Sequence, residues 1–218
     1  MLSIESELKT LKEGFKEMGI YAEEHILDKF SIYLKVLYNC KGRLHLISHN
    51  DYRRISLKHF LPSLMILKFI TNEQNACDIG AGAGFPSIPI KILKPEMNFT
   101  LFESIKKKAN FLKYLIKELN LSGIKVIAER AEKYHAEKFD LILIRAAGKI
   151  NELIKTIDLL IAPEGKAVFY KTMAVEEEIR HSKNRLDKNN FSVKVENVYT
   201  PVEKIPMSLV FLTKKCSQ

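Results

Sequence analysis

The chain has 218 residues, of which 46% are apolar and 28% are charged, and its formal net charge is +9. This length and composition can bury the core of one α/β domain with an appendage, but leave little room for two large domains. No apolar run reaches the roughly 18 to 20 residues that would span a bilayer, and residues 1–10 lack the basic start and apolar stretch of a signal peptide. We therefore expect a cytoplasmic protein with no membrane partner.

The pattern over residues 1–72 predicts helices and no strand. Apolar residues recur at spacings of three and four in two segments, Leu8, Leu11, Phe15 and Met18 in the first and Ile26, Phe30, Tyr33 and Leu37 in the second. A third helical segment is expected over residues 52–70, with Pro62 bending or restarting it. We expect residues 1–72 to form a helical region packed on the core of a second unit, residues 73–218.

From residue 75 onward, short β-rich runs alternate with amphipathic helices. Strands are predicted over residues 76–79, 99–103, 125–128, 139–144, 167–171, 193–199 and 209–213, the last two as a hairpin. Ser104 is expected to cap a helix with Ile105 and Leu112 on its apolar face. A second helix is expected over residues 151–162 and is closed by residues 163–165. Strands joined by such helices predict a doubly wound parallel sheet, an α/β fold.

A glycine-rich loop, Gly80-Ala81-Gly82-Ala83-Gly84, follows the first of these strands and opens a helix. Glycines let a backbone turn tightly and lie against a ligand, and helix-end N–H groups face that ligand. A dinucleotide fingerprint places its third glycine three positions beyond the second, where this chain has Phe85. Asp78, just before the loop, would repel a pyrophosphate and attract an ammonium or hydroxyl group. The spacing therefore favours a cofactor with an amino-acid end.

The second predicted strand ends at Glu103, 19 residues beyond Gly84 (103 minus 84). An acidic side chain at this position can accept hydrogen bonds from both ribose hydroxyls of an adenosine. Asp78, the glycine loop and Glu103 together therefore indicate a methyltransferase. A solvated strand-end carboxylate is the alternative interpretation of Glu103.

Several motifs resemble those of the bacterial 16S ribosomal RNA guanine-N7 methyltransferase family, also called the glucose-inhibited division protein B family. They are the cofactor loop over residues 78–86, the second strand over 99–104, "K-(K/R)-x-x-F-L" over 107–112, "R-(A/V)-E" at 130–132 and "(S/A)-R-A" at 144–146. The similarity runs from about residue 43 to residue 213.

The resemblance implies a Rossmann-like methyltransferase sheet with an N-terminal helical extension. The implied activity is transfer of a methyl group from S-adenosyl-L-methionine to N7 of one guanine in 16S ribosomal RNA. The implied cofactor-binding residues are Asp78, Gly80, Gly82, Phe85, Glu103, Ala131, Glu132 and Arg145, with Ala131 and Glu132 at the adenine edge. Arg145 is also the candidate near the target base, and no catalytic residue is otherwise assigned.

The chain departs from the family pattern away from the cofactor loop. The family's "N-L-T" stands here as residues 45–47, and its "H-x-x-D-S" as residues 59–63, where Pro62 replaces the aspartate. Pro206 and Met207 stand near the end, where the family usually has an arginine. These changes weaken any transfer of detailed RNA contacts.

The implied reaction needs no general base, because guanine N7 carries a lone pair and no proton. The chain would hold RNA, either 16S ribosomal RNA or the small ribosomal subunit particle, through basic groups: Lys41, Arg43, His45, His49, Arg53, Arg54, Lys58, His59 and Lys106 to Lys108.

Cys40, Cys77 and Cys216 form no close pair and no ligand spacing, so neither a disulfide framework nor a metal site is expected. We expect a monomer.

Three alternatives stay open on the sequence. The first is a methyltransferase of a small molecule or protein, with the basic charge incidental. The second is a nicotinamide-dependent oxidoreductase, against which Phe85 at the third-glycine position argues. The third is an RNA-binding module that binds no cofactor.

Overall fold

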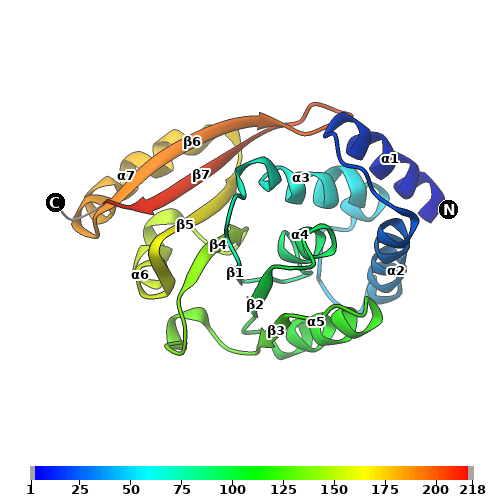
Figure 1. Ribbon diagram of the computed structural model, residues 1–218, viewed down its shortest axis with the longest axis horizontal. Helices are drawn as coiled ribbons and strands as arrows, with labels where there is room; N and C mark the ends of the chain where they lie inside the picture. Colours follow the sequence, from blue (N-terminus) through cyan, green and yellow to red (C-terminus); the bar gives the residue numbers. More distant parts are fainter. Residues whose placement is uncertain (1–2, 216–218) are drawn as a thin grey trace.

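The computed structural model describes residues 3–215, so Cys216 lies outside the described residues. Seven strands form a mixed sheet in the order β3-β2-β1-β4-β5-β7-β6. The strands are β1 (Asn75–Ile79), β2 (Asn98–Phe102), β3 (Ile124–Ile127), β4 (Phe139–Arg145), β5 (Ile161–Lys171), β6 (Phe191–Tyr199) and β7 (Pro206–Lys214). β1 to β5 run parallel, and β7 lies antiparallel between β5 and β6. The doubly wound α/β sheet and its terminal hairpin are confirmed (Figure 1).

Helices cover both faces of this sheet. They are α1 (Ile4–Glu17), α2 (Glu24–Cys40), η1 (Asn50–Arg53), η2 (Ser56–Phe60), α3 (Leu61–Leu64), η3 (Leu67–Phe69), α4 (Ser87–Leu93), α5 (Lys106–Glu118), η4 (Ala131–Lys133), α6 (Ile150–Leu160), η5 (Met173–Val175) and α7 (Glu176–Lys188). In Figure 1, α1 and α2 lie at one end of the molecule and α6 and α7 at the other. Within residues 3–215, no helix has the length and apolar character needed to cross a membrane.

The core divides into two clusters because successive side chains of a strand point to opposite faces. On β4, Leu141 and Leu143 belong to the cluster that includes the N-terminal helices, α4 and α5. The neighbouring Ile142 and Ile144 belong to the cluster under α6 and α7. All four side chains are buried, which is the pattern of parallel strands covered on both faces.

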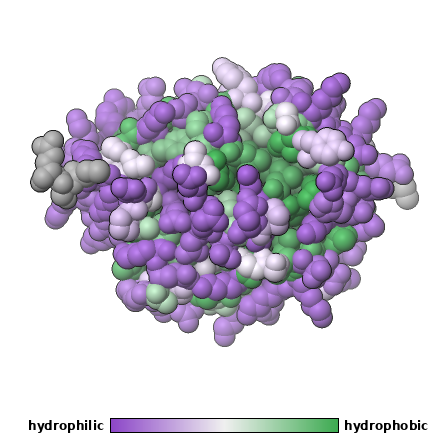
Figure 2. All heavy atoms as spheres, viewed as in Figure 1, coloured by the Kyte–Doolittle hydropathy of each residue, from purple (hydrophilic) through white to green (hydrophobic). Residues whose placement is uncertain are grey.

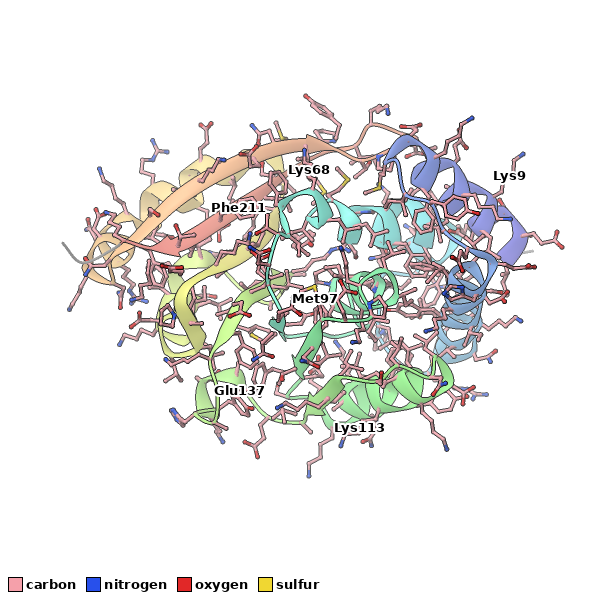
Figure 3. The ribbon with its side chains drawn as sticks, in the orientation of Figure 1. Lys9, Lys68, Met97, Lys113, Glu137 and Phe211 are labelled. Carbon is pink, nitrogen blue, oxygen red and sulfur yellow. The ribbon has the colours of Figure 1, made fainter. Side chains whose placement is uncertain are left out.

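The predicted apolar stripes of the first two helices are confirmed as core. Leu11 and Phe15 of α1, and Phe30, Tyr33 and Leu37 of α2, are buried in the same cluster as the sheet residues. In Figure 3, Met97 points into the molecule, whereas Lys9 of α1 and Lys113 of α5 extend outward. Figure 2 shows that hydrophilic side chains cover most of the face seen in Figure 1.

The third helical segment is interrupted near Pro62, as its sequence predicts. Residues 56–60 form a turn of π-helix, and α3 follows directly with Pro62 in its first turn. Pro62 has no N–H for the carbonyl of Lys58, four residues earlier, so that carbonyl needs another donor. The donor comes from the end of β4, as described below.

Two local predictions are wrong. Ser104 does not cap α5, whose N-cap is Ile105, and Ile105 is 52% exposed instead of sharing the buried face. No side chain caps α5, and the carboxylate of Glu103 accepts the N–H of the N-cap residue itself, Ile105, at 2.8 Å. Residues 163–165 do not close the preceding helix, because β5 already begins at Ile161 and continues through them with a shift in register. An irregularity of this kind is how a strand accommodates proline and glycine.

Candidate functional site

The glycine loop lies where β1 ends, at the carboxyl edge of the parallel strands. The N–H groups of Gly80 and Ala81 both donate to the carbonyl of Phe102, at 2.9 and 3.0 Å, which ties the start of the loop to the end of β2. Gly80 has φ +73°, and a Cβ there would lie 2.7 Å from the Cβ of Ala147. Only glycine combines this backbone conformation with such a close approach.

Asp78 lies beneath the loop as a buried and unpaired carboxylate. It is fully buried, and neither oxygen has a hydrogen-bond partner among residues 3–215. Burial raises the pKa of Asp78 from 3.8 to about 7, because desolvation outweighs the polar groups of Ser87 and the charge of Arg145. A buried acceptor without a partner costs free energy, so this group is suited to a ligand that supplies a donor.

Glu103 joins the end of β2 to the middle of the loop. Its Oε2 accepts the N–H of Gly82 at 3.0 Å, its Oε1 accepts the N–H of Ile105 at 2.8 Å, and the side chain is buried. A carboxylate has about four acceptor positions, so each oxygen can accept one more donor, such as a ribose hydroxyl. The exposed Ile105 beside it adds apolar surface.

A cavity of about 200 Å³ opens on this loop. Its walls come from the loop, from the segment before η1, from η2, from the start of α5 and from the end of β4: Leu46, Ile47, His59, Gly80, Ala81, Gly82, Ala83, Phe85, Lys108, Arg145 and Ala146. The structure therefore brings together four predicted site residues, Gly80, Gly82, Phe85 and Arg145, which come from two separate stretches of the chain.

The other predicted residues lie outside this lining. Asp78 is beneath the loop, and Glu103 accepts a hydrogen bond from the N–H of Gly82 in the loop. Ala131 and Glu132 lie in η4, after β3. Ala131 is buried, whereas the side chain of Glu132 is half exposed and lies 3.6 Å from Arg130.

Aromatic rings fix the position of Phe85. Its ring stacks on Tyr33 at 5.4 Å on one side and on His59 at 4.8 Å, with interplanar angles of 16° and 19°. Tyr33 Oη also donates to the carbonyl of Ala83 at 2.6 Å, which holds the loop against α2. The sequence gives no signal for these contacts, since Tyr33 belongs to an ordinary helical apolar stripe.

Arg145 connects the end of β4 to the helical region. Its Nη2 donates to the carbonyl of Lys58 at 2.6 Å, and its Nη1 donates to the carbonyl of His59 and to Ser63 Oγ, both at 3.2 Å. The carbonyls of Lys58 and His59 belong to the π-helical turn before Pro62, and Ser63 follows Pro62 in α3. A guanidinium carries five N–H groups, so three such bonds leave two donors for other partners.

His59 is part of this arrangement and is not free to contact RNA. Its Nε2 lies 3.2 Å from Asp51 Oδ2, and its ring covers Phe85. Burial lowers the pKa of His59 from 6.5 to about 4, with the charge of Arg145 adding to the effect and Asp51 opposing it. His59 is therefore neutral near pH 7.

Some of the basic residues predicted to hold RNA have protein partners and others are exposed, whereas Lys58 and Lys108 are half-buried. Arg54 is paired with Glu203, and Lys41 lies over the ring of Tyr52 at 5.3 Å. Arg43, His45, His49, Arg53, Lys106 and Lys107 are exposed. Among residues 3–215, no group of three or more His, Cys, Asp or Glu side chains could hold a metal ion.

The sequence of this chain is similar to those of a known family. Residues 26–205 match the model of a family described as rRNA small subunit methyltransferase G. The chain is 36% identical over 185 residues to the ribosomal RNA small subunit methyltransferase G of Desulforamulus reducens, covering 82% of this chain and 77% of the relative. The identity to the protein of the same name from Thermoanaerobacter pseudethanolicus is 33%, covering 95% and 90%.

Solved structures show the same fold. The ribosomal protein L11 methylase of Lactobacillus delbrueckii subsp. bulgaricus superposes with a TM-score of 0.58 at 15% identity, covering 80% of this chain and 83% of that one. The fold is thus the Rossmann-like methyltransferase fold with additional N-terminal helices.

Proposed function

Because the chain belongs to the rRNA small subunit methyltransferase G family, we propose that it transfers a methyl group from S-adenosyl-L-methionine to N7 of a guanine in 16S ribosomal RNA. One observation carries the proposal for this chain itself. The glycine-loop cavity lies over an unpaired buried carboxylate and is bordered by two basic segments, the loop carrying Arg43 and His45 and the helix start at Lys108. The first feature suits a sulfonium cofactor with an ammonium group, and the second suits RNA.

The residues at the loop fit such a cofactor. Asp78 would attract its ammonium group, the glycines would lie against its amino-acid end, and Glu103 would accept ribose hydroxyls. Ala131 and Glu132 would lie at the adenine edge, as in the family pattern, and Phe85 and Arg145 would line the end where the methyl group is carried. When bound, S-adenosyl-L-methionine supplies an electrophilic methyl group on a positively charged sulfur.

A dinucleotide fits less well. In nicotinamide-dependent enzymes the loop N–H groups face a pyrophosphate. In this chain the N–H of Gly82 is already bound by the carboxylate of Glu103, and a second carboxylate, Asp78, lies under the loop. Two acidic groups at this place would repel the phosphates.

The protein's own contribution to the reaction is positioning. Guanine N7 attacks through its lone pair and has no proton to lose, so no side chain has to act as a base. Holding N7 in line with the methyl carbon can contribute roughly 7 to 11 kcal/mol through orientation. The stacked rings around Phe85 and the three hydrogen bonds of Arg145 give the cavity the rigidity that this requires.

RNA binding would rest on exposed basic groups on both sides of the cavity. Arg43 and Arg53 lie before the π-helical turn, and Lys106 and Lys107 begin α5. Such groups bind phosphates and set the register of the RNA without reading its bases. We further propose that the protein works as a monomer in the cytoplasm, where ribosomal RNA is found.

The test is to map N7-methylguanine in small-subunit ribosomal RNA from cells with and without the gene. The proposal predicts one guanine that is methylated only when the gene is present, and whose methylation the purified protein restores with S-adenosyl-L-methionine. Identical maps from the two strains would refute it.

A further inference from the structure

A second cavity, of about 380 Å³, opens beside the glycine-loop cavity. Its lining comes from the ends of β4 and β5, from the helical segment around Pro62 and from the β6–β7 turn: Leu57, Lys58, Pro62, Arg145, Ala146, Tyr170, Lys171, Thr172, Thr200, Ile205 and Met207. Its volume is in the range of small-molecule sites. None of the loop glycines lines it.

The two cavities share two wall residues, Arg145 and Ala146. A group in the second cavity therefore lies next to the place where the cofactor's reactive end would be, on the far side of Arg145. The remaining walls offer apolar surface from Leu57, Pro62 and Met207 and polar groups from Lys58 and Thr172. This mixture suits a flat heterocycle that stacks on apolar side chains and forms hydrogen bonds at its edge.

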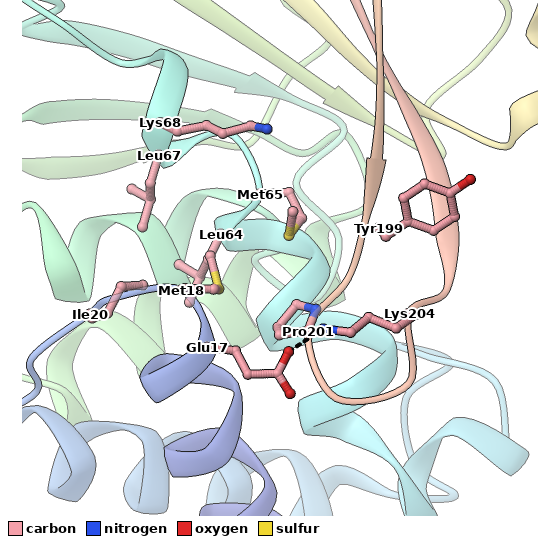
Figure 4. Close-up of a pocket in the computed structure, with 10 residues that line it drawn as sticks. All are labelled: Glu17, Met18, Ile20, Leu64, Met65, Leu67, Lys68, Tyr199, Pro201 and Lys204. Carbon is pink, nitrogen blue, oxygen red and sulfur yellow. Dashed lines mark hydrogen bonds and ion pairs between the residues drawn. The ribbon is translucent and has the colours of Figure 1, made fainter.

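A third cavity, on the other side of the β6–β7 turn, lacks this relation to the loop. Its lining includes residues of α1, α3 and the turn, and two of the lining residues, Glu17 and Lys204, form an ion pair (Figure 4). It shares no wall residue with the glycine-loop cavity. Of these two cavities, the second is the one that shares walls with the glycine-loop cavity and could present a substrate to the cofactor.

We propose that the second cavity receives the target guanine after the base has left its stack in the RNA, an inference that rests on the proposed function. With N7 directed toward the cofactor, the neighbouring O6 lies on the same edge of the base. Arg145 lines this boundary and retains two N–H donors beyond its three bonds to the helical region. A donor there can donate a hydrogen bond to the O6 of guanine, whereas it opposes the N6 amino group of adenine, which is itself a donor.

Filling the cavity tests the proposal. Met207→Trp and Thr172→Trp each add a large side chain at a lining position, and Thr172 is exposed, so its variant has room to fold. Val195→Trp is the matched control, because Val195 lies on the same hairpin, is 38% exposed and lines none of the cavities described above. Each variant is assayed for methyl transfer to small-subunit ribosomal RNA from cells lacking the gene, and for affinity to S-adenosylhomocysteine by calorimetry.

Both filling variants are expected to bind S-adenosylhomocysteine as the wild type does while kcat/KM for RNA falls roughly 10²-fold, the effect of displacing a reacting atom by about 1 Å. The control variant keeps both properties. Unchanged methylation in folded Thr172→Trp would overturn the proposal. So would a parallel loss of S-adenosylhomocysteine affinity, because the cavity would then belong to the cofactor site. A wild type that methylates no ribosomal RNA would instead refute the proposed function.

The role of O6 has its own test. Small-subunit RNA assembled from ligated fragments, with 2-aminopurine at the mapped position, keeps N7 but lacks O6. Methylation is expected to fall by roughly 5-fold to 150-fold, which corresponds to the loss of a good base-edge contact of about 1–3 kcal/mol. An unchanged rate would overturn the assignment of Arg145 as the group that reads the base.

Discussion

At the scale of single residues, Asp78 is the group that most needs a ligand. The folded protein keeps a proton on Asp78 up to about pH 7, whereas an unfolded chain loses it near 3.8. Between these values the unfolded state binds fewer protons, so this group makes the free energy of unfolding fall as pH rises. His59 acts in the opposite sense, because its pKa is lowered from 6.5 to about 4 in the folded protein. Its contribution to the free energy of unfolding is present above pH 6.5 and is lost as pH falls toward 4.

Comparing Asp78→Asn with the wild type isolates the first of these two effects. Relative to the wild type, the free energy of unfolding of Asp78→Asn is expected to be higher at about pH 8 than at about pH 5. The difference is a few kcal/mol at most, since each pKa unit corresponds to about 1.4 kcal/mol. Urea unfolding at the two pH values measures this difference. Asp187→Asn, at an exposed carboxylate, is the control substitution. If the Asp78→Asn difference does not change with pH, Asp78 is not the neutral buried acid described here.

The loop glycines give a second prediction at this scale. Gly80→Ala combines φ +73° with a Cβ 2.7 Å from Ala147, whereas Gly19→Ala has φ +67° with no atom within 4 Å. Both variants should lose about 1–2 kcal/mol through backbone strain. Only Gly80→Ala should also weaken S-adenosylhomocysteine binding, by about tenfold or more. Equal cofactor affinity in the two variants would mean that the loop does not contact the cofactor.

At the scale of elements, specific hydrogen bonds join α1 to the π-helical turn η2, and η2 to the end of β4. Glu7 of α1 is buried, its Oε2 accepts the N–H of Ser56 at 2.6 Å, and its carbonyl accepts the hydroxyl of Ser56 at 2.8 Å. Ser56 begins the π-helical turn whose carbonyls hold Arg145. The helical region and the site are therefore connected through η2.

Breaking the first of these bonds tests the connection. Glu7→Ala leaves a buried N–H without its partner and should lower the free energy of unfolding by about 1–3 kcal/mol. Glu5→Ala, at an exposed position of the same helix, should change it by less than about 0.5 kcal/mol. Urea denaturation followed by circular dichroism distinguishes them. Equal stabilities would show that α1 is not anchored at this point.

The elements that could be predicted from the sequence are those with strong apolar periodicity. β1 to β4 begin and end within one residue of the predicted bounds, because buried strands between helices give short, unmistakable apolar runs. α7 was not predicted, since in Glu176–Lys188 only Leu186 and Ser182 are buried and the rest of the helix is polar. The prediction for Ile105 was wrong because this residue is the N-cap of α5 and its side chain is 52% exposed, outside both core clusters.

The candidate site was predictable only where it is continuous in sequence. Gly80, Gly82 and Phe85 lie in one loop, and their spacing identified it. Tyr33 and the carbonyls around Pro62 could not be found in this way, because what makes them part of the site is contact between distant segments. The division of the chain at residue 72 stays a prediction.

At the scale of the whole molecule, the net charge of +9 should separate RNA binding from cofactor binding. A protein that neutralises about 6 to 10 phosphates loses roughly 10³-fold to 10⁵-fold in RNA affinity between about 50 and 200 mM salt. Affinity for S-adenosylhomocysteine should change far less over the same range. Filter binding of ribosomal RNA and calorimetry measure the two. A weak salt dependence of RNA affinity would favour the alternative in which the basic charge is incidental.

A pair of lysines localises this effect. Lys107→Gln, at the start of α5, should reduce the slope of log affinity against log salt by about one. Lys9→Gln, on the outer side of α1 (Figure 3), should leave the slope unchanged. Equal slopes in both variants would place the RNA elsewhere on the surface.

The central claim is that the glycine loop and its two carboxylates form a site for an adenosyl sulfonium. The most direct measurement is a calorimetric titration of the purified wild-type protein with S-adenosyl-L-methionine and, separately, with NADH. We predict saturable binding of one equivalent of the first and no heat from the second. Binding of NADH with no binding of S-adenosyl-L-methionine would contradict the account at its foundation.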